Sequence, residues 1–554
     1  MRRINNSFTF ARMYRSAFFY PCLLVLLWVL MICIVNPIGN FPLNDDWQYA
    51  RPVWFLINKG YYFSPDKYSP IIAAQVLWGT LFCLPGGFSF TALRVSVLVL
   101  GLIGVFVFYF LINRISHNKK IAFLGALLLL INPLYFSLSN TFMTDVPFLV
   151  FALISISLFF RALDNHHKGY LVFAVIFSII ATLIRQFGVV IPIAYSIAVI
   201  VKNKPNIKQA AFYFLPPLIT IVALELTLLW LKHIGSELHP YDGKSMVEFL
   251  SKPADIARYI FNRSGFLLFY TGFFLLPYTL FSGNIFLQNR SRKKKMTVLS
   301  LIIIFLPSLI HACINVPVGN ILGDGSIGPT TFRFENFWSD PGVIDIPYFG
   351  PLFTILSFAG AILLLIKIGT IIVEPKSPEK SYSTQQVFIV VCIFGYAFLM
   401  FIPDFFFDRY LLIFFPLFFL LSCRANHEVG KIRVPAFIIS SILISLTAVF
   451  STSGTHDYLA WNRARWSAWN YATTTMHIAP SAVDGGYECN GWSVGQFIYD
   501  PKVNTPPDLE YVLSFGERRE YFNLKQFPYQ NYLPYQMRNI CILRRKKISG
   551  FYFY

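Results

Sequence analysis

The chain has 554 residues, of which 56% are hydrophobic, 18% aromatic and only 13% charged, so a soluble monomer and a disordered chain are both excluded. Its formal net charge is +19 at pH 7. Most Lys and Arg stand in short loops between apolar runs of about twenty residues, which indicates a polytopic helical membrane protein rather than a nucleic-acid-binding protein.

The first apolar run, near residues 16–35, follows four arginines and no acidic residue. It lacks the small-residue cleavage site of a secretory signal, so we expect a retained first helix and a cytoplasmic N-terminus. Similar runs along the chain predict about thirteen transmembrane helices in total. The expected spans are 16–37, 88–113, 121–138, 146–163, 170–184, 187–201, 209–232, 264–284, 297–314, 348–372, 386–403, 410–423 and 434–451.

The charges of the loops agree with this count. The loops expected in the cytoplasm hold 23 Lys and Arg and four Asp and Glu, whereas the loops on the opposite side are acidic. An odd number of spans places the C-terminal region outside the cytoplasm. We therefore expect a multi-pass protein of a bacterial inner membrane with a periplasmic C-terminal region, although an endoplasmic-reticulum protein would have the same sidedness.

Two domains are expected. Residues 1–450 form the transmembrane domain, which includes the long external loops 38–87, 233–263 and 315–347. Residues 451–554 form a small outward-facing C-terminal α/β domain, with an amphipathic helix at 461–476 and strand-like runs at 511–515 and 540–543. The predicted fold class is mainly α.

An acidic pair stands just after the first span, in the stretch Asn44-Asp45-Asp46-Trp47-Gln48-Tyr49-Ala50. Two adjacent carboxylates at a membrane surface lie in a lowered dielectric, which raises the pKa of one of them and suits general-base catalysis or cation binding. The alternative is a simple N-cap for an interfacial helix that begins near Trp47.

A second acidic site, Asp145, follows the third span in Thr144-Asp145-Val146-Pro147, where it could equally cap the fourth helix. Two acidic sites at corresponding depths on one membrane face favour a functional site.

Three cations stand at the same face, where positive charge is uncommon. They are Lys67 in Lys67-Tyr68-Ser69-Pro70, Arg185 between the fifth and sixth spans, and Arg409 in Asp408-Arg409-Tyr410. Such residues could bind the phosphate of a lipid, or they could extend their charges to the membrane surface without any ligand.

These motifs, in this order and on this side, resemble the GT-C superfamily of polyprenyl-phosphate-dependent glycosyltransferases. The similar branch includes protein O-mannosyltransferases and the bacterial lipid A aminoarabinose transferase, and Phe90-Thr91-Ala92-Leu93-Arg94-Val95 also fits it. The chain departs from the pattern in two places. Lys67-Tyr68-Ser69-Pro70 replaces the Lys-Pro-Pro of the family, and Arg185 stands where the family has Lys.

The resemblance implies a GT-C-like fold and an inverting membrane glycosyltransferase of the cell envelope. Its donor would be a polyprenyl-phosphate-linked sugar and its acceptor a lipid, a glycan or a protein. Asp45 would be the essential carboxylate with Asp46 beside it, and Asp145 would be the second acidic motif. Donor phosphate binding would fall to Lys67, Arg409, Arg185 and Tyr410. No nucleotide is required, because the activated bond arrives in the lipid donor, and the acidic motifs leave room for a divalent cation as cofactor.

The alternative function is a secondary transporter or lipid flippase of the envelope, which usually carries charges at mid-membrane and two similar halves. Glu225 lies inside the seventh span, where it could form a hydrogen bond to a neighbouring helix or take part in a proton relay. Gly323-Asp324-Gly325-Ser326-Ile327-Gly328 matches a nucleotide-binding pattern but lacks the preceding strand, so we interpret it as a loop. Cys489 and Cys541 could form a disulfide, or both could remain buried thiols.

Overall fold

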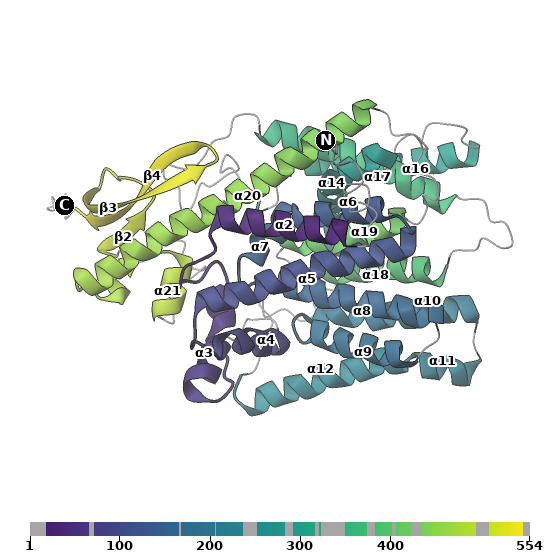
Figure 1. Cartoon of the computed structure of the whole chain (residues 1–554), viewed down its shortest axis with the longest axis horizontal. Helices are drawn as coiled ribbons and strands as arrows, with labels where there is room; N and C mark the ends of the chain where they lie inside the picture. Colours follow the sequence, from purple (N-terminus) through teal and green to yellow (C-terminus); the bar gives the residue numbers. More distant parts are fainter. Residues whose placement is uncertain are drawn as a thin grey trace, which may run out of the picture.

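The computed structural model is mostly helical, with a small sheet at one end of the molecule (Figure 1), which confirms the mainly α fold class. The structure describes residues 18–65, 71–165, 168–204, 206–236, 252–282, 292–315, 319, 321–322, 349–373, 383–401, 406–423, 434–494 and 509–546.

Helical segments lie at all of the expected spans. They are α2 (Phe19–Val35), α5 (Phe90–Ser116), α6 (Lys119–Leu130) with α7 (Pro133–Ser139), α8 (Asp145–Asn165), α9 (Lys168–Thr182), η1 (Gln186–Val189) with α10 (Val190–Asn203), α11 (Ile207–Tyr213) with α12 (Leu215–His233), α14 (Pro253–Ser282), α16 (Arg292–Asn315), α17 (Phe349–Ile372), α18 (Thr384–Phe401), η2 (Asp408–Ile413) with α19 (Phe414–Cys423), and α20 (Val434–Asn470). Within the described residues, nine helices are long and apolar enough to cross a membrane, or ten if the bent pair α6 and α7 forms one span. The helices α2 and α9 are shorter, so the length and composition of the described helices do not by themselves identify all thirteen expected spans.

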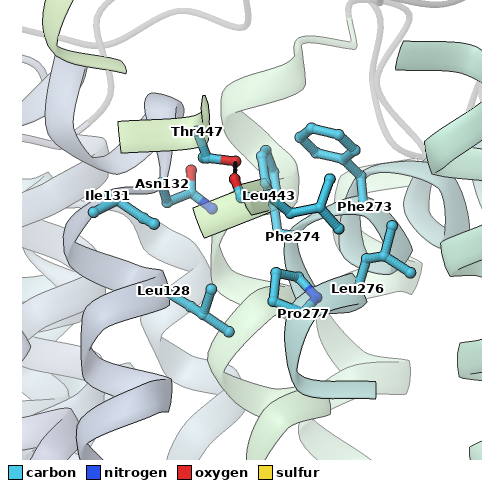
Figure 2. A pocket seen from close by; sticks show the side chains of 9 residues that line it. All are labelled: Leu128, Ile131, Asn132, Phe273, Phe274, Leu276, Pro277, Leu443 and Thr447. Atoms are coloured by element: carbon cyan, nitrogen blue, oxygen red, sulfur yellow. Dashed lines mark hydrogen bonds between the residues drawn. The ribbon is translucent and has the colours of Figure 1, made fainter. Parts of the chain in front are cut away.

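The third expected span is broken at Asn132-Pro133, where α6 and α7 meet at 61°. Proline lacks an N–H and cannot continue the ladder of α6, while the Asn132 side chain accepts hydrogen bonds from the N–H groups of Leu134 and Tyr135 and so begins α7. A cavity of about 20 Å³, enough for one water, lies beside Asn132 between α14 and α20 (Figure 2). Because α7 ends at Ser139, the chain then leads directly into Asp145 at the start of α8.

Two further helices, α3 (Asp46–Lys59) and α4 (Ala73–Cys83), lie in the first long loop. In Figure 1 they stand at the same end of the molecule as the sheet. The helix α3 is only weakly apolar, and its buried residues include the acidic Asp46. The acidic pair therefore stands where the chain enters α3, outside the long apolar helices.

The C-terminal region holds a four-stranded sheet in the order β1-β2-β4-β3, in which β1 and β2 are parallel and the other pairs antiparallel. Its elements are β1 (Val483–Asp484), α21 (Tyr487–Val494), β2 (Tyr511–Ser514), β3 (Tyr521–Tyr532) and β4 (Tyr535–Arg545). The strands expected at 511–515 and 540–543 are thus confirmed, and β3 forms an edge of the sheet.

The domain boundary expected at residue 451 lies inside α20, which is continuous from Val434 to Asn470 and ends in a π-helical turn at Tyr471–Thr475. In the polar run after Phe450, which is helical, the Thr452 and Thr455 hydroxyls donate to the carbonyls four residues earlier, so these two buried or partly buried groups are satisfied within the helix. The helix expected at 461–476 is therefore the outer half of α20 and not a separate element. The division into two domains stays a prediction.

The two cysteines of this region hold separate free thiols. Cys489 lies in α21 and Cys541 in β4, and both are buried. Burial raises the pKa of the Cys489 thiol to about 12. Of the two alternatives, the structure therefore has the pair of buried thiols, which behave as small apolar side chains.

Candidate active site

Asp45 and Arg409 form an ion pair between the start of α3 and η2. The Nη1 and Nη2 atoms of Arg409 both donate to Oδ2 of Asp45, each at 3.2 Å. The Arg409 side chain is 6% exposed, whereas that of Asp45 is 19% exposed. Asp45 therefore keeps part of its carboxylate open at the edge of an otherwise buried cluster.

A second ion pair joins Arg185 to Asp145. Arg185 Nη2 lies 2.9 Å from Asp145 Oδ1, and Arg185 Nε donates to the Thr144 hydroxyl at 2.7 Å. Asp145 is almost fully buried, and within the described residues neither of its oxygens receives a hydrogen bond of good geometry. An isolated buried carboxylate is costly, so the nearby Arg185 charge is essential to keep Asp145 in place.

The Tyr410 ring connects the two ion pairs. The guanidinium groups of Arg185 and Arg409 lie 5.5 Å and 5.8 Å from its centroid, within the range of cation–π attraction. Arg409 Nη1 also lies 4.0 Å from the Met143 sulfur. The structure thus brings together the predicted site residues Asp45, Asp145, Arg185, Arg409 and Tyr410.

Asp46 points into a different environment from that of Asp45. It is fully buried, and its carboxylate accepts hydrogen bonds from the N–H groups of Phe142, at 2.8 Å, and Leu43, at 3.3 Å. Burial raises the pKa of Asp46 to about 7, although these two N–H groups and the charge of Arg94 oppose the shift. Asp46 therefore fixes the first loop against the segment that carries Asp145.

The segment before Asp145 is held from two sides. The N–H of Phe142 donates to Asp46, and its carbonyl accepts a hydrogen bond of 2.6 Å from the Gln75 side chain in α4. The buried Arg94 of α5 holds the first loop in turn, since it donates to the carbonyls of Pro37, Gly39 and Phe41. Both acidic motifs are therefore fixed by backbone contacts with neighbouring helices.

The third element, η2, is anchored by Asp408. This fully buried carboxylate accepts hydrogen bonds from the N–H groups of Ile321 and Leu322, the shortest at 2.6 Å. It thereby holds the start of η2 against the described part of the third long loop. Arg409, the next residue, then extends to Asp45.

The C-terminal region completes the cluster through α21. The hydroxyl of Tyr487 donates to Oδ1 of Asp45, and Glu488 accepts a hydrogen bond from the Asn44 N–H at 3.0 Å. Arg51 donates to the carbonyl of Gly491. A side chain at Gly491 would collide with the Trp47 ring, so only glycine allows this close contact.

Sequence reasoning missed Tyr487, because no local signal marks it beyond the preceding Gly485-Gly486 turn. Burial, together with the charge of Asp45, raises the pKa of Tyr487 well above its ordinary value, so its hydroxyl remains a donor at neutral pH. Lys67 and Gly323-Gly328 lie outside the described residues. Glu225 is exposed on α12.

The acidic residues of the cluster do not form a set of ligands for a divalent cation. Among the described residues, no group of three or more His, Cys, Asp or Glu side chains is arranged to hold a metal ion. Asp45 and Asp145 face arginines, and Asp46 faces backbone N–H groups. The described donor set therefore does not fit a metal site, and the chemistry below uses side chains alone.

Comparison with known proteins agrees with part of this description. A family model described as dolichyl-phosphate-mannose-protein mannosyltransferase matches residues 69–230, a stretch that includes Asp145 and Arg185 but neither Asp45 nor Arg409. This match confirms, for that stretch, the resemblance to GT-C glycosyltransferases. A search of curated proteins finds no match.

Solved structures are similar over most of the chain, at low identity. ArnT from Cupriavidus metallidurans bound to undecaprenyl phosphate shares 11% identity, with 97% of this chain and 100% of that chain covered and a TM-score of 0.40. The archaeal oligosaccharyltransferase AglB from Archaeoglobus fulgidus, in complex with an inhibitory peptide and a dolichol-phosphate, shares 14% identity. The match covers 82% of this chain and 58% of that chain, with a TM-score of 0.42. The arabinosyltransferase EmbB from Mycobacterium smegmatis shares 10% identity, with 84% of this chain and 44% of that chain covered and a TM-score of 0.33.

Proposed function

We propose that this protein is an integral membrane glycosyltransferase, which moves a sugar from a polyprenyl-phosphate donor to an acceptor hydroxyl. The observation that carries the proposal is the contact of a partly exposed carboxylate, Asp45, with a buried arginine, Arg409, that can receive a phosphate. The family match over residues 69–230 supports the same class of enzyme.

In the proposed reaction, Asp45 accepts the proton of the acceptor hydroxyl as its oxygen attacks the anomeric carbon of the donor sugar. The bond between that carbon and the phosphate oxygen breaks, and the polyprenyl phosphate leaves with the electron pair. A single direct displacement inverts the anomeric centre. Arg409 and Arg185 stabilise the negative charge that develops on the departing phosphate. Lys67 is proposed to assist them.

The ion pairs explain how such a buried cluster stays stable without donor. The two arginines are balanced by Asp45 and Asp145, so the cluster carries no net charge. A bound phosphate would draw Arg409 toward itself and release Oδ2 of Asp45. The general base would therefore become available only when the donor is in place.

We place this reaction at the periplasmic face of a bacterial inner membrane, with the C-terminal region on the same side. The basic loops expected on the opposite side support this placement. The acceptor is proposed to be a lipid, a glycan or a protein of the cell envelope.

The rival function is a secondary transporter or lipid flippase. Asp145 begins α8 and Arg409 lies in the short η2, so these charges stand at the ends of helices rather than within unbroken spans. The expected span boundaries put Asp145 and Arg409 at the outer face of the membrane, whereas transporters usually carry such charges near mid-membrane, so this position favours transfer chemistry over alternating access.

The decisive experiment compares Asp45→Asn with Asp164→Asn in the purified full-length protein. Asp45→Asn keeps the shape of the side chain but removes the base, so sugar transfer should be lost while the variant still folds, with a melting temperature lowered by the loss of the charged partner of Arg409. Asp164 pairs with Arg114 at the other end of α8, and its replacement should leave transfer intact. Wild-type turnover by Asp45→Asn would refute the proposed mechanism.

A further inference from the structure

The β3–β4 hairpin lies along the outer half of α20 and runs antiparallel to it. Near the end of the helix, the Lys525 ammonium lies 3.8 Å from the centre of the Tyr471 ring. Closer to the membrane-spanning half, the N–H groups of Tyr532 and Leu533 donate to Asp457 at 2.7 Å and 2.9 Å. The turn of the hairpin therefore points back toward the membrane, in agreement with its course in Figure 1.

The depth of this turn follows from the helix. The apolar half of α20 ends at Phe450, and only 11% of its most apolar stretch is buried within the protein, so it faces lipid. Asp457 lies seven residues beyond Phe450, about 10 Å along the helix axis. Further along the helix, the Arg463 side chain reaches the carbonyl of Asn36, which directly follows α2, so this part of α20 lies level with the outer end of the first expected span.

The turn exposes apolar side chains at that depth. Tyr532 is 40% exposed, Tyr535 76% and Met537 66%. Tyrosine is enriched at membrane–water interfaces because its ring is apolar and its hydroxyl is polar. Lipid is therefore a better neighbour for this turn than open water.

A pocket of about 320 Å³ opens beside the turn, between α20 and β3. Its polar lining includes His456, Arg463 and Ser467, and its apolar lining includes Ala460 and Phe527. The volume is within the range of pockets that bind small molecules. The pocket thus combines cationic and apolar walls beside the outer end of the first expected span.

The positive charge in this pocket is not neutralised by the described residues. Arg463 donates from Nη1 to the carbonyl of Asn36 at 2.7 Å. Its other N–H groups remain for a ligand, because within the described part of the chain Arg463 forms no ion pair with a carboxylate. Asp457 is already occupied by two N–H groups and by Nδ1 of His456, at 2.9 Å. The His456 ring is held in place by stacking on Tyr532, with centroids 3.6 Å apart.

We propose that this pocket binds the phosphate-bearing headgroup of an anionic membrane lipid. Arg463 binds the phosphate, Ser467 offers a hydroxyl, and the acyl chains descend beside the exposed turn into the leaflet. The site is separate from the Asp45 cluster and does not rest on the proposed transfer reaction, because binding is measured without any sugar donor.

The test measures binding of dioctanoyl phosphatidic acid to the purified full-length protein in detergent. Arg463→Gln should weaken binding by about tenfold or more, because it removes a charged hydrogen-bond donor. Ser467→Trp should have the same effect by filling the pocket, since Ser467 is exposed and tolerates a larger side chain. The matched control is Arg519→Gln, which removes one exposed positive charge outside the pocket and should change the dissociation constant less than about twofold.

Two further ligands distinguish the sources of the phosphate. Dioctanoylglycerol should not bind, and inorganic phosphate at the same concentration should not compete. Equal binding of dioctanoylglycerol, equal competition by inorganic phosphate, or an equal loss in Arg519→Gln would each overturn the proposal. Unchanged binding in a folded Arg463→Gln protein would overturn it as well. If that variant does not fold, the result for Ser467→Trp decides.

Discussion

The hydroxyl of Tyr487 donates a hydrogen bond of 2.9 Å to Oδ1 of Asp45, although 442 residues separate the two in the chain. The same hydroxyl accepts a hydrogen bond from the Gln48 side chain, also at 2.9 Å. Since Arg409 contacts the other oxygen of Asp45, the carboxylate is held from both sides. The C-terminal region therefore contributes directly to the orientation of the proposed base.

Replacing Tyr487 with Phe should lower kcat by about tenfold and leave KM nearly unchanged, because one hydrogen bond to a charged acceptor is lost. Steady-state kinetics with a lipid-phosphate sugar donor checks this. Tyr535→Phe is the matched control, since Tyr535 is 76% exposed and pairs with Tyr532 at the turn between β3 and β4. A rise in KM alone would show that Tyr487 binds substrate instead of orienting Asp45.

Arg409→Gln and Lys67→Ala should weaken use of the donor more than use of the acceptor, because the proposed partner of both residues is the donor phosphate. The measurement is KM for each substrate at saturating concentrations of the other. Arg114→Gln removes a cation of the Arg114–Asp164 pair and should leave both values unchanged. If only the acceptor KM rises, the phosphate role is wrong.

Asp46 should make the protein less stable as the pH rises from about 4 to about 7. Its pKa in the folded chain is about 7, whereas an unfolded chain has the ordinary value near 4. In this interval the unfolded chain releases the proton and the folded chain keeps it, so stability falls by up to about 1.4 kcal/mol per pH unit. The melting temperature of Asp46→Asn minus that of the wild type should therefore increase between pH 5 and pH 7. A constant difference would contradict the raised pKa.

Glu488→Ala should lower both stability and activity. Glu488 lies 2.8 Å from Arg465, and both side chains are almost fully buried. Removing the carboxylate leaves a buried guanidinium without its counterion, at a cost of about 3–5 kcal/mol. Thermal melting in detergent checks this, and the double variant Arg465→Met with Glu488→Met should regain much of the loss. A wild-type melting temperature for Glu488→Ala would show that the pair does not hold α21.

Hydropathy located the helical spans well, because the length and composition of an apolar run are local properties. The strands at 511–515 and 540–543 were predictable for the same reason, since a short apolar run between turn residues is also a local property. The continuous course of α20 was not predictable from the sequence, because the polar run at 451–455 has the composition of a loop. The Thr452 and Thr455 hydroxyls are satisfied inside the helix, which composition does not reveal.

The proposed site was only partly predictable. The order of the motifs indicated Asp45, Asp145, Arg185 and Arg409, and the structure brings these four side chains into one cluster. The separate environments of Asp45 and Asp46 depend on contacts with Arg409 and with Phe142, which lie far away in the sequence. Adjacent identical residues carry no signal that tells which of them faces the substrate.

Because α20 is unbroken, the number of its residues fixes the rotation of its outer half relative to its inner half. Along its length it packs on α14, α7 and α2, and its outer half carries β3 and, through Arg465, α21. An α-helix turns by about 100° and rises by about 1.5 Å per residue. One residue inserted near Ser453 would swing the entire outer half around the helix axis and separate Tyr487 from Asp45. Seven inserted residues would restore the angle, but they would lift the sheet by about 10 Å. The geometry of the proposed site is therefore set by the number of residues in a helix that does not itself enter it.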